Sequence, residues 1–406
     1  MKMRKIIPSL LAAQVALAGC EGPCEPGTYA YDLKHLQDCG FEPVELVGAD
    51  GLSRLIVVPA LQGRVMTSTT GGLKAPGYGW INHKYIDEGA RSPQFNPYGG
   101  EERFWIGPEG GPFSWYFAPG AGQTYANWRV PAGIDTERFE VESVSGSAIV
   151  LTHRLDWNNA SGRRFIIDVK RSVELVDDAA AVLSGGALAI PDGVRVIAYR
   201  TVNTLTNGGD SAWDAESGMP SVWLLGCFTP TPTTTVFIPY DKSFGGKPVN
   251  DEYFGKVPAD RLVVEDGMVY FKIDGEFRSK IGLPKGSAKD LCGSYDSARK
   301  VLTILKYTVP EGDNVYVNGQ WGLQDDPFSG DVINSYNDGV TDTGTLMGPF
   351  YEIETSSPAA RLAPGESLTH TQYTIHMEGP EAALKQIAAA VFGADLDKVG
   401  SMFDNK

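Results

Sequence analysis

Basic side chains and metal-binding side chains are both scarce in this 406-residue sequence. Lysine and arginine together number 35 against 50 aspartate and glutamate residues, and the formal net charge is −15 at pH 7. Because nucleic-acid binding needs a basic face that neutralises phosphates, we expect no nucleic-acid partner. The five histidines show no recognisable ligand spacing, and neither a CxxC nor an HExxH motif occurs. The sequence therefore predicts no metal and no cofactor.

Long apolar segments are also missing, except at the N-terminus. Residues 1–19 join a basic start to an apolar run that is too short to span a bilayer and is typical of a secretory signal. The run ends in Leu-Ala-Gly-Cys, which resembles a bacterial lipobox, so Cys20 is predicted to carry a lipid. The alternatives are an ordinary signal cleaved nearby and an anchor that stays in place. We expect a bacterial envelope protein, periplasmic or facing the outer membrane, whose only membrane contact is this anchor.

Four further cysteines follow the lipobox: Cys24, Cys39, Cys227 and Cys292. An exported protein can oxidise its thiols, and a Cys24–Cys39 bond would close a short loop near the anchor. Four cysteines allow three pairings, and spacing alone does not choose among them.

Strand patterns dominate residues 20–406. "RRFIIDVKRSVELV" (163–176) alternates apolar and polar residues and follows "SAIVLTHRLDW" (147–157) across a turn-forming cluster, which predicts a hairpin. Asp266-Gly267 predicts a second hairpin within 261–273. Helix signals are limited to 32–38 and to 381–392, where a proline precedes the segment and a glycine follows it. Repeated strands with turns between them predict a single all-β sandwich or barrel domain over residues 20–406.

The segment "NPYGGEERFWIGPEGGPFSWYF" (96–117) follows neither helical nor clean strand spacing. Aromatic side chains with a few polar groups among them are typical of a small-ligand site, so this composition favours ligand binding. The alternative is a structural loop that packs over the end of a sandwich. Arg103 is the candidate polar contact, and its alternative role is an ion pair with a neighbouring glutamate. Further candidates, each either ligand-binding or structural, are Trp105, Glu109, Trp115 and Trp128.

Two other polar clusters are candidates for ligand binding. "GWINH" contributes Asn82 and His83. The segment around "SYNDG" contributes Asn334, Tyr336 and Asp338, for which a plain Asn-Asp-Gly turn is the alternative interpretation.

Several phrases of this sequence together resemble a known family. They are "GWINH", "NPYGGEERFWIGPEGG", "VNDEYFGKVPADR" (249–261), "SYNDG" and "YEIETSSPAA" (351–360). The chain after the signal is similar throughout to an uncharacterised bacterial family of the galactose mutarotase-like superfamily. The resemblance implies a β-supersandwich of two large antiparallel sheets with a short C-terminal helix. It also implies a saccharide site on the concave face of one sheet.

The resemblance also implies a chemistry. Mutarotases open and reclose a sugar hemiacetal with a carboxylate base and an acid, commonly histidine. Their base stands in a late "ETQ" phrase, to which "ETS" at 354–356 corresponds, and strand alternation places Glu352 and Glu354 on one face. Where mutarotases carry a histidine in an "HGG" phrase, this sequence has "YGG" at 98–100. Glu354 is therefore the candidate base and His83 the candidate acid.

Three functions remain open at this level. The first is a mutarotase-like enzyme that acts on a sugar or uronate, and the second is a non-catalytic glycan-binding lipoprotein. The third is a glycosidase or polysaccharide lyase that uses paired acids such as Glu102 and Glu109. Whether the protein is an enzyme thus depends on which of the candidate side chains converge on one cavity.

Overall fold

The computed structural model describes residues 24–341, 344 and 346–404. The predicted signal segment and the lipid-bearing Cys20 lie outside this range, so their prediction stays a prediction. Among the described residues, no helix combines the length and the apolar character needed to cross a membrane.

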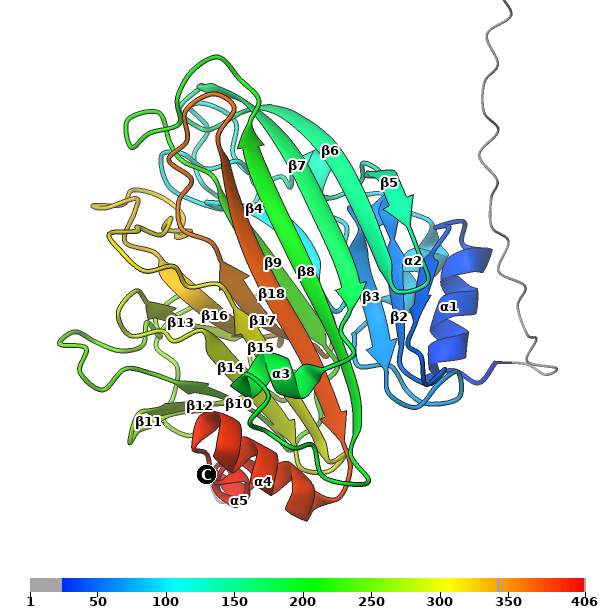
Figure 1. The fold of residues 1–406 in the computed structure, drawn as a ribbon. Helices are drawn as coiled ribbons and strands as arrows, with labels where there is room; N and C mark the ends of the chain where they lie inside the picture. The colour runs from blue at the N-terminus through cyan, green and yellow to red at the C-terminus, as the bar shows by residue number, and fades with distance from the viewer. Residues whose placement is uncertain (1–23, 342–343, 345, 405–406) are drawn as a thin grey trace, which may run out of the picture.

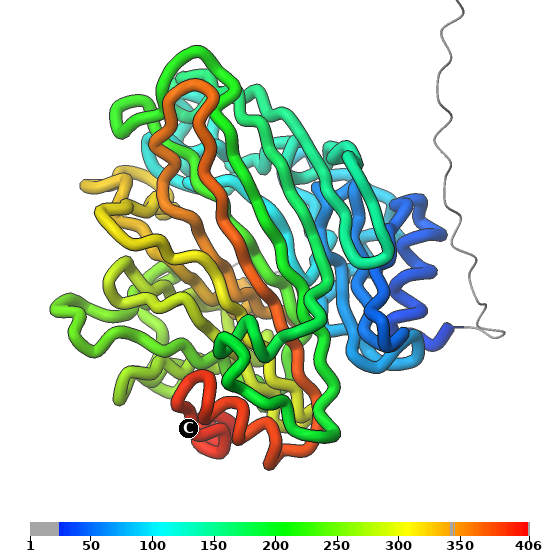
Figure 2. The backbone as a smooth tube through the Cα atoms, viewed as in Figure 1, coloured from blue at the N-terminus to red at the C-terminus, as the bar shows by residue number. Residues whose placement is uncertain are grey.

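The larger of the two main sheets has ten strands, and all of its strand pairs are antiparallel (Figure 1). In spatial order it contains β11 (Leu262–Glu265), β12 (Met268–Lys272), β10 (Thr234–Pro239), β14 (Leu291–Asp296), β15 (Val301–Tyr307), β18 (Ser367–Glu378), β8 (Arg195–Asn207), β7 (Arg164–Leu175), β6 (Ala148–Asn158) and β5 (Glu140–Val144). Figure 2 shows the long hairpin of β6 and β7 beside β8, with the closing strand β18 next in the sheet.

The second main sheet has five antiparallel strands. In spatial order it contains β13 (Ser279–Pro284), β16 (Asp331–Asn337), β17 (Tyr351–Ser356), β9 (Ser221–Phe228) and β4 (Arg103–Gly107). A third sheet, near the N-terminus, contains β1 (Val44–Val47), β2 (Arg54–Val58) and β3 (Arg64–Thr69). An isolated bridge between Val65 and Glu102 connects this small sheet to the residue just before β4.

Helices pack beside the small N-terminal sheet and against the outer face of the ten-stranded sheet (Figure 1). They are α1 (Tyr29–Asp38), α2 (His83–Glu88), α3 (Ala179–Ser184), α4 (Glu381–Phe392) and α5 (Leu396–Ser401), with short 3₁₀ turns at Pro59–Leu61 and Ala132–Ile134. α1 buries Leu33 and Leu36 against β2 and β3, and α4 buries Leu384 and Ile387 with apolar residues of the ten-stranded sheet. Both helices predicted from the sequence are therefore confirmed, and Gly393 ends α4 in the left-handed conformation as expected.

Strand alternation explains the core between the two main sheets. Along β7, Phe165, Ile167, Val169, Arg171 and Val173 are buried on one side, while the residues that alternate with them point to the other side. The apolar residues among them pack with Phe104 and Ile106 of β4 in one apolar cluster. Ile333 and Ile353 continue the core in a second cluster with strands β10 and β12. The two large sheets therefore bury one face of each against the other.

The predicted hairpins and the predicted fold class are confirmed. β6 and β7 pair in register from Ala148 opposite Glu174 to Asn158 opposite Arg164. β11 and β12 are joined by Asp266 and Gly267, which have φ angles of 51° and 84° and so supply the two positive φ values of a type I′ turn. The described chain is mostly β, with large antiparallel sheets and C-terminal helices.

Candidate functional site

The five-stranded sheet has an apolar face toward the ten-stranded sheet and a polar face on its other side. Thr355 of β17 points inward, where its Oγ1 lies 2.9 Å from Nε2 of His370 on β18. Since neighbouring residues of a strand point to opposite sides, Glu354 and Glu352 point outward. Ion pairs connect these two carboxylates to Arg103 on β4 and Lys280 on β13. We call Arg103, Trp223, Lys280, Glu352 and Glu354 the acid–base cluster.

Glu354 stands at the centre of the acid–base cluster and is almost completely buried. Its Oε2 accepts hydrogen bonds from Nζ of Lys280 at 2.7 Å and from the indole Nε1 of Trp223 at 2.9 Å. A nearby ammonium group and a second donor both favour the ionised form of a buried carboxyl group. The side chain of Lys280 is only 13% exposed, so solvent screens this ion pair weakly. Both donors thus contact the same one of the two carboxyl oxygens of Glu354.

Glu352 has a different environment on the same strand face. Its Oε1 lies 3.0 Å from Nη2 of Arg103, whose guanidinium lies 4.1 Å from the ring centroid of Trp105. Burial raises the pKa of Glu352 to about 7; Arg103 opposes this rise and the neighbouring Glu354 adds to it. At neutral pH a proton therefore exchanges readily at Glu352, which can act as an acid or as a base.

Glu109 brings a third carboxyl group to this face from the loop that follows β4. It is partly buried, and burial raises its pKa; Lys280 acts in the opposite direction and Glu354 adds to the rise. Three of the site residues predicted from the sequence therefore converge on the polar face of the five-stranded sheet: Arg103, Glu109 and Glu354.

Aromatic rings surround the acid–base cluster. Trp105 and Trp223 pack edge to face with ring centroids 5.5 Å apart, and Nζ of Lys280 lies 5.4 Å from the ring of Tyr253. Trp128 stacks on Trp321 with centroids 6.1 Å apart. Trp321 is 38% exposed and connects the buried cluster with the surface. Aromatic faces beside ionic groups are what a sugar needs for its C–H and hydroxyl surfaces.

The candidates on β16 extend the polar face. In register, Asn334 lies opposite Glu354 and Tyr336 lies opposite Glu352. Asn334 Nδ2 donates to Oη of Tyr253 at 3.0 Å, and Tyr336 Oη donates to Asp338 Oδ1 at 2.7 Å. These three predicted residues therefore belong to the same face as the acid–base cluster.

Several polar atoms of this face are buried and have no hydrogen-bond partner among the described residues. They are Nε of Arg103, Nε1 of Trp105 and Oε1 of Glu354. A buried polar atom left unsatisfied costs about 1–3 kcal/mol, so unsatisfied atoms are rare unless function retains them. Two donors and one acceptor in one neighbourhood match the alternating donor and acceptor character of sugar hydroxyls.

The structure places the candidate acid His83 elsewhere. His83 begins α2, and its Nε2 lies 2.8 Å from Oδ1 of Asp32 on α1. Its ring also packs against His35, while Asn82 caps α2 by accepting from the amide of Tyr85. The structure therefore does not bring His83 and Asn82 to Glu354. Their surroundings are set by the packing of α1, which the local sequence around "GWINH" does not reveal.

Two other candidates lie in the interior. Trp115 packs edge to face on Phe165 of β7, and its Nε1 donates to the carbonyl of Gly107 at 2.8 Å. Glu102 is fully buried, and its Oε1 lies 2.9 Å from Nη2 of Arg171 on the ten-stranded sheet. Trp115 thus has the core role that was one of its two alternatives, and Glu102 is paired with Arg171 instead of facing Glu109 across a ligand.

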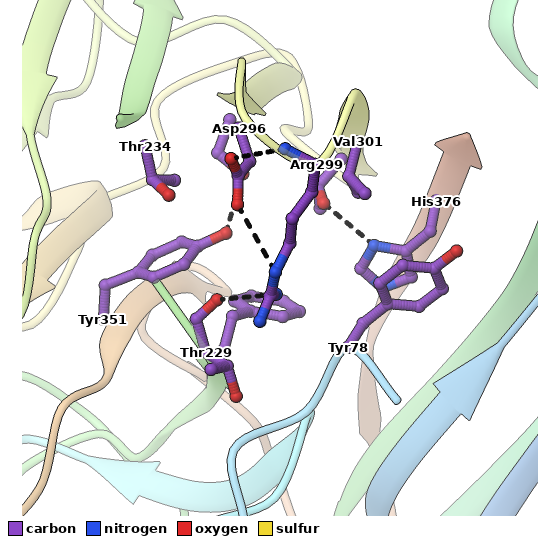
Figure 3. A pocket seen from close by; sticks show the side chains of 11 residues that line it. Tyr78, Thr229, Thr234, Asp296, Arg299, Val301, Tyr351 and His376 are labelled. Atoms are coloured by element: carbon purple, nitrogen blue, oxygen red, sulfur yellow. Dashed lines mark hydrogen bonds and ion pairs between the residues drawn. The ribbon is translucent and has the colours of Figure 1, made fainter. Parts of the chain in front are cut away.

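A small cavity of about 20 Å³ lies near one edge of the interior (Figure 3). It is lined by Tyr78, His376 and Tyr351, and by Arg299, whose Nε lies 3.7 Å from Oδ2 of Asp296. A space of this size holds about one water molecule, so it is too small for a sugar.

The four described cysteines are all free thiols: Cys24 and Cys39 near the N-terminus, and Cys227 and Cys292 in the interior. None of the three possible pairings is therefore formed among the described residues. Cys227 and Cys292 are buried, and burial raises the pKa of both thiols.

Sequence reasoning missed Lys280, Trp223 and Tyr253. Lys280 alternates with buried Ser279 and Ile281 in β13, which marks it only as a residue of the opposite face. Tyr253 stands in the phrase "VNDEYFGKVPADR", which was noted for its resemblance but not for a ligand role. Their roles depend on strand neighbours that are distant in the chain.

Comparison with known proteins places the chain within a family. The Slr1438 protein of Synechocystis sp. PCC 6803 is 14% identical, with a TM-score of 0.51 over 83% of this chain and 96% of that chain, which shows a shared fold. A galactose mutarotase-like protein of Lactobacillus casei is 9% identical with a TM-score of 0.47, over 82% of this chain and 99% of that chain. A galactose mutarotase related enzyme of Lactobacillus acidophilus is 8% identical with a TM-score of 0.44, over 83% and 97% of the two chains. No curated protein matches the chain. The sequence matches the Family of unknown function (DUF6786) over residues 27–403, and the chain therefore belongs to that family.

Proposed function

We propose that the polar face of the five-stranded sheet binds a saccharide and catalyses proton transfer at its hemiacetal centre. The observation that carries the proposal is that two carboxyl groups on one strand face have different surroundings. Lys280 and Trp223 both donate to Oε2 of Glu354 and leave its Oε1 unsatisfied, while burial raises the pKa of Glu352 to about 7. Paired groups whose environments separate their protonation states are typical of acid–base sites.

The proposed reaction assigns one role to each carboxyl group. Oε1 of Glu354 accepts the proton of the anomeric hydroxyl, and protonated Glu352 donates a proton to the ring oxygen as the bond between that oxygen and the anomeric carbon breaks. The open aldehyde rotates, and the ring closes again with both proton transfers reversed. Arg103 remains beside Glu352 and supplies an unsatisfied Nε–H to a sugar hydroxyl. This scheme keeps Glu354 as the base but replaces His83 with Glu352 as the acid.

The resemblance to the galactose mutarotase-like superfamily supports the same choice, since Glu354 stands in the late "ETS" phrase that corresponds to the mutarotase base. The sugar or uronate on which the protein acts is left to experiment. A panel of aldoses and uronates, each added as a single anomer, can be followed by polarimetry or NMR. Wild-type protein should accelerate anomer exchange of at least one of them above the buffer rate.

Variants then assign the roles. Glu354→Gln and Glu352→Gln keep the side-chain shapes, and each should lower the rate by about 10²- to 10⁴-fold. Glu142→Gln is the matched control, because Glu142 also lies 2.8 Å from a lysine, Lys170, but on the exposed surface. Anomer exchange no faster than buffer with every sugar of the panel would reject the proposed reaction.

One observation favours a second candidate, a non-catalytic glycan-binding protein. The histidine acid that the mutarotase resemblance predicts is paired with Asp32 in the helical region, away from Glu354. Under this alternative, calorimetry or NMR detects saccharide binding that Arg103 substitutions weaken, while wild-type protein leaves the anomer exchange rate unchanged.

We also propose that the protein works as an envelope lipoprotein anchored through Cys20. The support is the basic, apolar and Leu-Ala-Gly-Cys sequence of residues 1–20. Cells that express the full chain should incorporate labelled fatty acid into it, and Cys20→Ser should abolish the label. Undiminished labelling of the variant would contradict the anchor.

A further inference from the structure

A second group of chemically reactive side chains lies on α1 and α2, which pack against the small N-terminal sheet. It contains His35 on α1, Cys39 at the C-cap of α1 and Asp87 on α2. His35 and Cys39 are four residues apart, and the amide of Cys39 donates to the carbonyl of His35 at 3.0 Å. This spacing places both side chains on one face of α1.

Three ligand atoms converge at this place. Nε2 of His35 lies 2.7 Å from Oδ1 of Asp87 and 3.9 Å from Sγ of Cys39. An ion pair between the histidine and the aspartate would explain the first contact alone. The four-residue spacing brings the thiol of Cys39 to the same ring nitrogen, and the three atoms all lie within 4.8 Å of one another.

Both helices hold these ligand atoms on rigid supports. Leu36, next to His35, and Ile86, next to Asp87, are buried in the apolar cluster that joins α1 and α2 to β2 and β3. Thr28 caps the start of α1, and Gly89 ends α2 in the left-handed conformation. Sites built on packed helices keep their geometry better than sites on loops.

We propose that His35, Cys39 and Asp87 bind a divalent transition metal ion, with Zn²⁺ as the natural occupant. The ion takes the place of the proton shared by His35 Nε2 and Asp87 Oδ1, and the thiol of Cys39 binds as a thiolate after losing its proton. Imidazole, thiolate and carboxylate are the ligands that Zn²⁺ combines in proteins. Three protein ligands leave a fourth tetrahedral position for water.

The distances are compatible with this occupant. Tetrahedral Zn²⁺ with bonds of about 2.0–2.3 Å needs ligand atoms roughly 3.3–3.8 Å apart. The separations of His35 from Asp87 and from Cys39, 2.7 Å and 3.9 Å, lie on either side of that range, and the separation of Cys39 from Asp87 is within 4.8 Å, so side-chain rotations bring the three atoms to it. Asp87 is 61% exposed and free to adjust, whereas the side chain of His35 is 10% exposed and fixed by its packing.

The aromatic rings around His35 hold its imidazole in position. The ring of His83 packs edge to face on the ring of His35, with centroids 4.8 Å apart, and Asp32 holds His83 in place through a 2.8 Å contact. Tyr31 stacks on the ring of His35, with centroids 5.9 Å apart. This arrangement gives the "GWINH" histidine a positioning role beside the proposed metal ion.

Two titrations test the proposal on metal-free full-length protein kept reduced with a phosphine that does not chelate. Calorimetry with ZnCl₂ should show one equivalent bound. CoCl₂ should produce the near-ultraviolet absorption of a thiolate–cobalt bond together with the visible bands of tetrahedral cobalt. Cys39→Ser should abolish the thiolate absorption, and His35→Ala should weaken Zn²⁺ binding by about tenfold or more, as losses at metal sites generally do.

Matched controls separate this site from adventitious binding. Cys24→Ser removes another N-terminal thiol and should leave both titrations unchanged. His153→Ala removes a histidine that also contacts a carboxylate, Glu137, at 3.0 Å but has no thiol beside it, and it should have no effect either. Circular dichroism confirms that each variant is folded.

A measurement on wild-type protein makes the test independent of any variant. Alkylation of each thiol by iodoacetamide is mapped by peptide mass spectrometry with and without Zn²⁺. The ion should slow alkylation of Cys39 but not that of Cys24. The proposal is overturned if Zn²⁺ does not bind, if the cobalt–thiolate absorption survives in Cys39→Ser, or if Cys39 reacts equally fast with and without the ion.

Discussion

Nζ of Lys280 lies 2.7 Å from Oε2 of Glu354, although the two residues belong to strands that flank β16 and do not pair with each other. β16 places Tyr336 opposite Lys280 and Asn334 opposite Glu354, so the lysine reaches diagonally across one strand. The contact joins the edge strand β13 to the central strand β17 of the five-stranded sheet. Removal of either side chain therefore leaves the other as a buried charge without its partner.

The first prediction concerns this pair. Lys280→Met should lower the free energy of unfolding by about 3–5 kcal/mol, because Glu354 would then be a buried charge without its cation. Adding Glu354→Gln to Lys280→Met should restore much of that loss, since no lone charge remains. Urea unfolding of both single variants and the double variant measures the coupling. Strictly additive single effects would show that the ion pair is not coupled.

The second prediction concerns pH and Glu352. Its folded-state pKa of about 7 lies above the ordinary value of 4.5, so between these values the folded protein binds the proton more tightly than the unfolded chain. The contribution of Glu352 to the free energy of unfolding therefore falls as pH rises from about 4.5 to about 7. Urea unfolding across this range should show the decline, and Glu352→Gln should flatten it. The proposed reaction should also slow above about pH 7, where Glu352 loses its acidic proton.

The third prediction concerns saccharide binding at Arg103. Monosaccharide binding should be weak, on the order of millimolar, which corresponds to about −4 kcal/mol. Arg103→Ala should weaken it about tenfold or more, and Arg103→Lys should recover only part, because lysine lacks the planar fork of donors. Arg154→Ala, at an exposed arginine paired with Asp168, is the control. Affinity that is unchanged in Arg103→Ala would remove this residue from the site.

The fourth prediction concerns Glu102 and Arg171 between the sheets. Both side chains are fully buried, so Glu102→Gln should destabilise the protein by about 3–5 kcal/mol by leaving the arginine uncompensated. Glu174→Gln, which removes the partner of Arg200 at the partly exposed surface, should cost only about 0–1 kcal/mol. Thermal or urea unfolding compares the two variants. Equal losses would contradict the structural role assigned to Glu102.

Local features of the sequence were sufficient for much of the fold. The period-two pattern of 163–176 identified β7, Asp266-Gly267 identified a hairpin turn, and the residues flanking 381–392 identified α4. Each of these follows from neighbours along the chain, because side-chain alternation, positive φ values and helix ends are local properties. The same alternation placed Glu352 and Glu354 on one face.

Tertiary structure alone decided which side chains meet there. Lys280 and Trp223 are 74 and 131 residues from Glu354 in the chain, and both contacts depend on strand order and register. His83 looked equally suited to the site, yet the packing of α1 paired it with Asp32 and set it beside His35. The sequence by itself determined the strands, the turns and the chemical nature of the polar face. The pairing of distant strands determined the partners of each charge, because a buried charge is stabilised only by the groups that the fold brings within a few ångströms of it.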